Sequence, residues 1–126
     1  MDAQKQIDYW RHGSEEDMDA AEVLMEKGII RHALFFAELA VEKMIKAYLA
    51  RKIKDIPPKT HDLLRLSDLA EIPLSPDFRR FLARFQEYCL EGRYPEYIPS
   101  APSRDQAEPE FQECREFLSW LKNQFK

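Results

Sequence analysis

The segment from about Ile30 to Ile53 constrains the fold of this chain most, because it contains neither glycine nor proline. An uninterrupted stretch of this length is typical of a long helix. Its apolar residues, which run from Leu34 through Met44 to Leu49, cover more than one stripe of such a helix. The pattern therefore predicts a central helix that is buried on more than one side.

The segment before the central helix is amphipathic as well. From Ile7 to Lys27, apolar or small residues recur every three to four positions, and acidic residues fill the other face. Gly28 then provides a stop before the central helix begins. We expect a long first helix with an acidic outer face.

A short third helix is expected after the Pro57-Pro58 pair, over residues 62–69. Thr60 or His61 can serve as its N-cap. His61 beside Asp62 has a second interpretation, because an imidazole next to a carboxylate can act in acid–base chemistry. The capping interpretation, with Asp62 in the first turn, is favoured.

Two further helices complete the pattern. Ser75 and Pro76 are an N-cap followed by a first-turn proline, and they open a fourth helix. Residues 103–106 read Ser-Arg-Asp-Gln, a capping box that opens a fifth helix, and Pro109 marks either a kink in that helix or its true start. Because no strand-like alternation of useful length occurs, the predicted fold is an all-α, up-and-down bundle of about five helices.

The composition limits the class of protein. With 126 residues the chain has room for one domain, which we expect to span residues 1–126. No run approaches the roughly eighteen apolar residues of a membrane span, and the first residues lack a secretory signal, so we expect a cytoplasmic protein without membrane contact. Cys89 and Cys114 lie within amphipathic patterns, which suits buried thiols and no structural disulfide. The net charge of -4 argues against a general nucleic-acid coat, although a local basic patch can still bind phosphate.

The central and fifth helices carry more apolar surface than one core seam requires. In the fifth helix, Phe117 and Trp120 lie off the stripe that contains Leu118 and Leu121. Such an excess is often an oligomer contact, and we expect a homodimer.

The sequence offers little for metal or common hydrolase chemistry. His12, His32 and His61 are dispersed, and no two of them stand at i, i+4 near a carboxylate as in a helical zinc site. The nucleophile and phosphate-loop motifs of common hydrolases and kinases are absent. We therefore predict no metal site, no catalytic residue and no cofactor.

One motif in the first helix superficially resembles catalytic elements of nucleotidyltransferases. Gly13-Ser14 is followed by Asp17-Met18-Asp19, as in their Gly-Ser and Asp-x-Asp elements. Positions i and i+2 of a helix point to different sides, whereas that catalytic pair needs a strand to converge. We interpret these residues as a solvated acidic face.

The best candidate for a site is the segment Glu91–Glu96, where the fourth helix should end and a proline-containing loop should begin. Gly92 can take the left-handed conformation that ends a helix, which presents Arg93 and Tyr94 at the helix end. A guanidinium binds phosphate, and an aromatic ring can stack on a base. A rigid connector is the structural alternative.

Basic residues in the second half of the central helix and in the following turn are further candidates. The helix dipole favours cations near a helix C-terminus, which explains them without any ligand. If they converge with Arg93 and Tyr94, they form a site for a phosphate and a base. The candidates from these two elements are Lys43, Lys46, Lys59 and His61.

Four blocks of sequence carry a family resemblance. They are Trp10 with Asp17-Met18 and Ala21, residues 33–47, residues 58–64 and residues 92–96. In this order they resemble the HEPN family, the helical domains named for higher eukaryotes and prokaryotes nucleotide binding. The resemblance implies an α-helical up-and-down bundle that is commonly a homodimer.

The resemblance also bears on function. Many HEPN proteins are ribonucleases, often toxins of toxin–antitoxin pairs, in which an arginine is followed four to six residues later by a histidine. After Arg93 those positions hold Tyr97, Ile98 and Pro99. Tyrosine, with an ordinary pKa near 10, is a poor replacement for histidine in proton transfer at neutral pH. The Arg-Tyr-Pro form instead resembles the branch of the family often encoded beside a minimal nucleotidyltransferase.

The resulting prediction is a nucleotide- or RNA-binding accessory module. It is non-catalytic by itself and works with a minimal nucleotidyltransferase partner in a toxin–antitoxin-like pair. One alternative is a metal-independent ribonuclease toxin with an atypical site, such as Arg93 with His61 across a dimer. The other is a structural dimerisation module without a ligand.

Overall fold

The computed structural model describes residues 3–91 and 102–125, without the side chains of residues 88–91. Within this part of the chain, five α-helices and no strand are present. The helices are α1 (Ala3–Glu26), α2 (Ile30–Ile53), α3 (Leu63–Leu69), α4 (Pro76–Glu91) and α5 (Arg104–Asn123). The predicted all-α bundle is confirmed.

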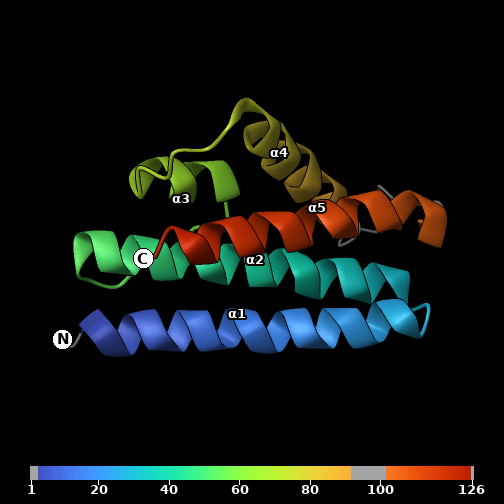
Figure 1. The fold of residues 1–126 in the computed structure, drawn as a ribbon, viewed down its shortest axis with the longest axis horizontal. Coiled ribbons are helices and arrows are strands. Elements are labelled where there is room, and N and C mark those ends of the chain that lie inside the picture. Colours follow the sequence, from blue (N-terminus) through green and yellow to red (C-terminus); the bar gives the residue numbers. More distant parts are fainter. Residues whose placement is uncertain (1–2, 92–101, 126) are drawn as a thin grey trace.

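Helix α2 is the centre of the bundle, as predicted. It packs against each of the other four helices, and most of its side chains are buried. Figure 1 shows α1 and α5 running alongside α2, with α3 and α4 on the side away from α1. Small side chains let the neighbouring backbones approach α2 closely. The fully buried alanines of α2 include Ala33, Ala37, Ala40 and Ala47.

Left-handed residues mark the ends of the two long helices. Gly28, with a φ of 79°, lies in the turn between α1 and α2. Helix α2 ends at Lys54, whose φ is 56° and whose N–H donates to the carbonyl of Ala50. Helix α1 begins at Ala3, earlier than the predicted Ile7. None of the described helices is long and apolar enough to cross a membrane.

Helix α3 is capped by Asp62, so the predicted cap at Thr60 or His61 is wrong. The Asp62 carboxylate accepts hydrogen bonds from the N–H groups of Leu64 and Arg65. A carboxylate at this position is also favoured by the helix dipole, which an imidazole cannot match. The His61 side chain instead turns back toward α2.

The starts of α4 and α5 agree with the predicted caps. Ser75 Oγ accepts a hydrogen bond from the N–H of Phe78. Ser103 and Gln106 form both bonds of the capping box. Helix α5 therefore begins at Arg104, and Pro109 lies inside the helix rather than at its start.

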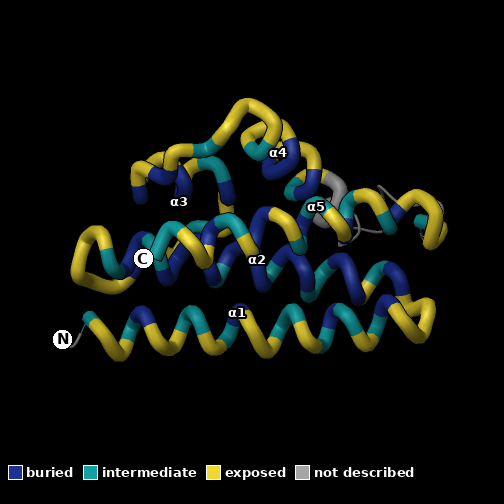
Figure 2. Tube along the Cα trace, in the orientation of Figure 1, coloured by how far each residue is buried: buried dark blue, intermediate teal, exposed yellow. Residues whose placement is uncertain are grey.

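The extra apolar residues of α5 are used within the chain. Phe117 is fully buried, and the rings of Phe117 and Trp120 lie 5.3 and 5.2 Å from the ring of Phe78 on α4. Figure 2 shows exposed positions along the outer side of α1, whereas most of α2 is buried. Phe117 and Trp120 thus hold α4 on the bundle, and fully buried Phe117 leaves no apolar surface of its own for an oligomer contact. The homodimer itself stays a prediction.

Candidate functional site

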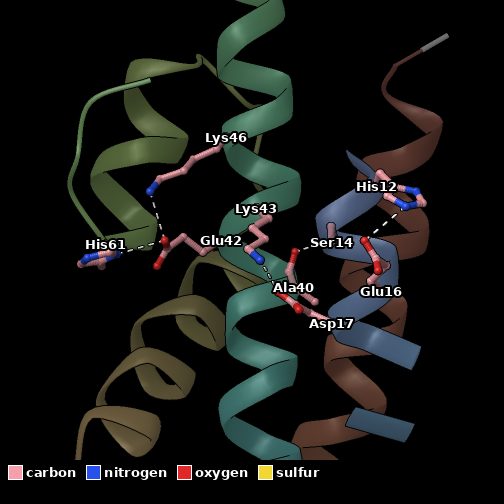
Figure 3. Close-up of polar contacts among 9 residues, drawn as sticks. All are labelled: His12, Ser14, Glu16, Asp17, Ala40, Glu42, Lys43, Lys46 and His61. Carbon is pink, nitrogen blue, oxygen red and sulfur yellow. Dashed lines mark hydrogen bonds and ion pairs between the residues drawn. The ribbon is translucent and has the colours of Figure 1, made fainter. Parts of the chain in front are cut away.

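Two of the predicted site residues meet at a buried carboxylate of α2. Glu42 Oε2 lies 3.1 Å from Lys46 Nζ, one turn further along the helix, and 3.0 Å from His61 Nδ1. Figure 3 shows the two side chains reaching Glu42 from α2 and from the turn before α3. We call Glu42, Lys46 and His61 the turn cluster. The second half of the central helix and the His61 turn therefore converge.

Local bonds in the turn hold His61 above α2. Pro57 is buried, and its ring fixes one backbone angle of the turn. Thr60 Oγ1 accepts a hydrogen bond from the N–H of Asp62, which itself caps α3. His61 thus lies between two residues that a side-chain-to-backbone hydrogen bond joins.

The turn cluster has a buried interior and one exposed group. The side chains of Glu42 and Lys46 are only 5% and 6% exposed, whereas that of His61 is 70% exposed. The carboxylate and the ammonium balance each other's charge inside the protein, as a buried ion pair requires. Trp10 of α1 covers the ammonium of Lys46, whose Nζ lies 5.1 Å from the ring centroid. Glu42 Oε1 has no hydrogen-bond partner among the described residues.

Lys59 lies in the same turn, two residues before His61. Its side chain is exposed, and it forms no ion pair with any residue that the structure describes. Lys59 and His61 therefore present an ammonium and an imidazole to solvent from one short segment. Arg93 and Tyr94, the other predicted contacts, lie outside the described residues.

Lys43, also predicted as a ligand contact, does not join the turn cluster. Its Nζ lies 2.8 Å from Asp17 Oδ2 of α1. Its stem passes close to Gly13, where an added Cβ would lie 3.2 Å from Lys43 Cδ. Figure 3 shows Lys43 directed toward Asp17 while Lys46 is directed toward Glu42. Lys43 therefore ties α1 to α2.

The interpretation of the Gly13–Asp19 motif as a solvated face is wrong for two of its residues. Ser14 is buried, and its hydroxyl donates to the carbonyl of Ala40 at 2.6 Å. Asp17 is half-buried by its ion pair with Lys43. Both residues face α2 because they lie three positions apart on one side of α1. Asp19 is exposed, as expected of the acidic face.

Cys114 lies apart from the turn cluster, in the core of α5. It is a free thiol that donates to the carbonyl of Ala37, and its burial raises its pKa far above the ordinary value of a thiol. A thiol held in its neutral form is a poor nucleophile, so Cys114 is a packing residue. The side chain of Cys89 lies outside the described part. Within the described ranges, no three His, Cys, Asp or Glu side chains are grouped so as to hold a metal ion.

Glu42 is the functional candidate that the sequence reasoning missed. Glu38, Glu42 and Lys46 are spaced four residues apart on α2, and all three are buried. Charged residues rarely occupy such positions unless they are paired. A line of charges at i, i+4 and i+8 within the most apolar helix is therefore a signal that could have identified Glu42.

Comparisons with known proteins agree with this architecture. A sequence profile of the HEPN domain matches residues 7–124, while a search of curated proteins finds no match. The solved structure of TT1696 from Thermus thermophilus is similar with a TM-score of 0.77 at 20% identity, over 98% of each chain. The structure of ST0689, an archaeal HEPN homologue, has a TM-score of 0.74 at 19% identity, over 95% of this chain and 98% of its own. Since the profile match extends over nearly the whole chain and the folds are shared, the chain belongs to the HEPN domain family.

Proposed function

We propose that this HEPN domain is an accessory module that binds a nucleotide or RNA and does not itself cleave it. The observation that carries the proposal is the meeting of Lys46 and His61 at Glu42, beside the exposed Lys59. The turn thereby offers a cation and an imidazole to solvent over a charge-balanced, buried support. Phosphate groups are favourable ligands for such a surface.

Arg93 and Tyr94 supply the remaining contacts in this proposal. The guanidinium would bind a phosphate in bidentate fashion, and the phenol ring would stack on a base. Lys46 has a different task, because it is buried beneath Trp10 and supports the turn rather than facing the ligand. Lys43 is engaged with Asp17 and contributes to the helix pairing instead.

The partner chain is the second part of the proposal. The Arg-Tyr-Pro sequence at residues 93–95 supports a minimal nucleotidyltransferase as the partner in a toxin–antitoxin-like pair, in which this chain is a homodimer as in many members of the family. A neighbouring open reading frame with Gly-Ser and Asp-x-Asp elements would provide the partner for a co-purification test. Light scattering after size-exclusion chromatography then gives the stoichiometry, and elution of this chain as a monomer without the partner would contradict the pairing.

Titration of the purified protein with AMP and with a fluorescent RNA hexamer tests the binding function. Arg93→Ala should weaken binding about tenfold or more, because a hydrogen bond to a charged group is lost. Lys59→Ala should weaken it about two- to fivefold, as expected for one exposed charge. Lys27→Ala removes an exposed lysine at the far end of α1 and is the matched control, which should leave the affinity unchanged. If wild-type protein binds neither probe, the ligand part of the proposal is wrong.

A metal-independent ribonuclease with an atypical site is the second candidate function. The observation in its favour is the contact of His61 with a buried carboxylate, an arrangement that suits a general base. RNA cleavage in the presence of a chelator, by wild-type protein and by His61→Ala, distinguishes the two functions. Cleavage that depends on His61 supports the enzyme, and its absence in clean wild-type preparations removes it.

A further inference from the structure

The contact between His61 and Glu42 determines which ring nitrogen carries the hydrogen. A carboxylate oxygen can only accept hydrogen bonds, and Glu42 Oε2 lies 3.0 Å from His61 Nδ1. Nδ1 must therefore be the donor. In a neutral imidazole the other nitrogen, Nε2, then carries a lone pair and is an acceptor.

Glu42 Oε2 has a second partner besides the ring. Lys46 Nζ lies 3.1 Å from the same oxygen, and buried Glu38 lies one turn before Glu42 on α2. The charged residues nearest to His61 in the sequence of the turn are Lys59 and Asp62, which are of opposite sign. From α4, the uncharged Gln86 accepts a hydrogen bond from the N–H of Leu63. Lys46 thus holds the Glu42 carboxylate from inside the protein, and His61 contacts the same oxygen from the turn.

The ring is held at one edge and open at the other. Glu42 is buried and cannot follow a movement of the ring, whereas the imidazole is mostly exposed. Figure 3 shows His61 reaching Glu42 from the turn before α3. A side chain anchored at Nδ1 and exposed elsewhere presents Nε2 to a ligand.

We propose that Glu42 is a positioning residue that fixes His61 as a hydrogen-bond acceptor for a ribose hydroxyl. The inference rests on the proposed binding of a nucleotide or RNA at this turn. Phosphate oxygens only accept hydrogen bonds, so a lone pair at Nε2 cannot bind them. A hydroxyl of the adjacent sugar can donate to it while Lys59 binds the phosphate. The ligand class is therefore a ribonucleotide in preference to its deoxy counterpart.

Nitrogen-detected NMR of the histidine rings tests the role of Glu42 without any ligand. In wild-type protein at about pH 7.5, where an ordinary histidine is mostly neutral, His61 should show a single tautomer with hydrogen on Nδ1. Glu42→Gln should give a mixture of tautomers, since an amide can donate as well as accept. Glu16→Gln, which alters the exposed partner of His12, is the matched control and should leave the His61 signals unchanged. An equal tautomer mixture in the wild type overturns the role of Glu42.

Titration with AMP, 2′-deoxy-AMP and 3′-deoxy-AMP tests the ligand class. Wild-type protein should bind AMP about two- to tenfold more tightly than one of the deoxy analogues, the range for one neutral hydrogen bond. In Glu42→Gln, AMP and the deoxy analogues should bind with about equal affinity. A second variant, His61→Phe, changes a mostly exposed side chain and keeps the test valid if Glu42→Gln fails to fold. It should lose the preference while retaining weak binding through Lys59.

The outcomes separate this inference from the proposed function. Equal binding of AMP and both deoxy analogues by wild-type protein overturns the ribose contact and leaves phosphate binding intact. Absence of binding to all three and to RNA overturns the proposed function and the ribose contact together. The ligand-free tautomer measurement then still decides whether Glu42 positions His61. A matched pair of RNA and DNA hexamers, run in parallel, shows whether the ribose belongs to a free nucleotide or to a strand.

Discussion

Two histidine–glutamate pairs in this protein have similar nitrogen–oxygen distances but differ in how deeply the carboxylate is buried. His12 Nε2 lies 3.2 Å from Glu16 Oε1 on α1, where the side chains are 75% and 68% exposed. His61 Nδ1 lies 3.0 Å from Glu42 Oε2, and there only the histidine is exposed. Both pairs are drawn in Figure 3. The distance does not separate them, but the burial of the carboxylate does.

The difference decides which pair can support a function. At an exposed pair, water and salt screen the attraction, and both side chains lose conformational freedom when they meet. At the turn cluster, Glu42 is already fixed by packing and by Lys46, so only the His61 ring has to be ordered. A pair with one buried member is therefore a firmer support than the pair on α1, in which both side chains are exposed.

The largest effect should come from removing the Glu42 carboxylate, and a separate variant without the Glu16 carboxylate provides the comparison. Glu42→Ala leaves the Lys46 ammonium buried without its partner and should lower the free energy of unfolding by about 3–5 kcal/mol. Glu16→Ala should change it by less than about 0.5 kcal/mol, as is usual for an exposed ion pair. Urea unfolding at neutral pH measures both. Equal losses in the two variants would show that burial is not what distinguishes the pairs.

A smaller effect should separate His61 from its neighbour Asp62. Asp62→Ala removes the N-cap of α3 and should cost about 1 kcal/mol. His61→Ala removes a mostly exposed ring that forms no cap and should cost less than about 0.5 kcal/mol. The same urea titrations apply. A larger loss for His61→Ala than for Asp62→Ala would show that the contact of His61 with Glu42 stabilises the fold more than the cap of α3 does.

Much of the fold could be predicted because its determinants are local. The absence of glycine and proline between Ile30 and Ile53 defines α2, and Ser75 and Ser103 mark the starts of α4 and α5. The cap of α3 was misassigned by one or two residues. Thr60, His61 and Asp62 stand in succession, and only the three-dimensional path of the turn selects Asp62.

The candidate site depended on contacts between distant segments, which spacing alone does not give. Lys46 and His61 could be named from their chemistry, but their meeting at Glu42 depends on the path of the turn after Lys54. The sequence could not show that Lys43, one turn of helix away, points to α1. Side-chain direction on α2 separates two lysines that the sequence places in one basic run.

The smallest effect concerns the exposed ion pair of Lys52 and Glu71, whose Nζ and Oε2 atoms lie 2.7 Å apart. This pair shows how the stability contributed by an exposed carboxylate should depend on pH. Its hydrogen bond and attraction lower the pKa of Glu71 and raise that of Lys52. Because the pKa of Glu71 is lower in the folded protein, its charge adds to the free energy of unfolding at a pH above the ordinary pKa of 4.5. That stabilisation is lost as the pH falls through the lowered pKa. The raised pKa of Lys52 likewise keeps the pair intact until the pH rises above the lysine range.

Lys52→Ala should therefore lower the urea midpoint slightly at neutral pH, and the difference from wild type should shrink toward about pH 3. Since both side chains are in water, added salt should abolish the difference as well. A difference that grows in acid would show that Lys52 does not stabilise the protein through its ion pair with Glu71.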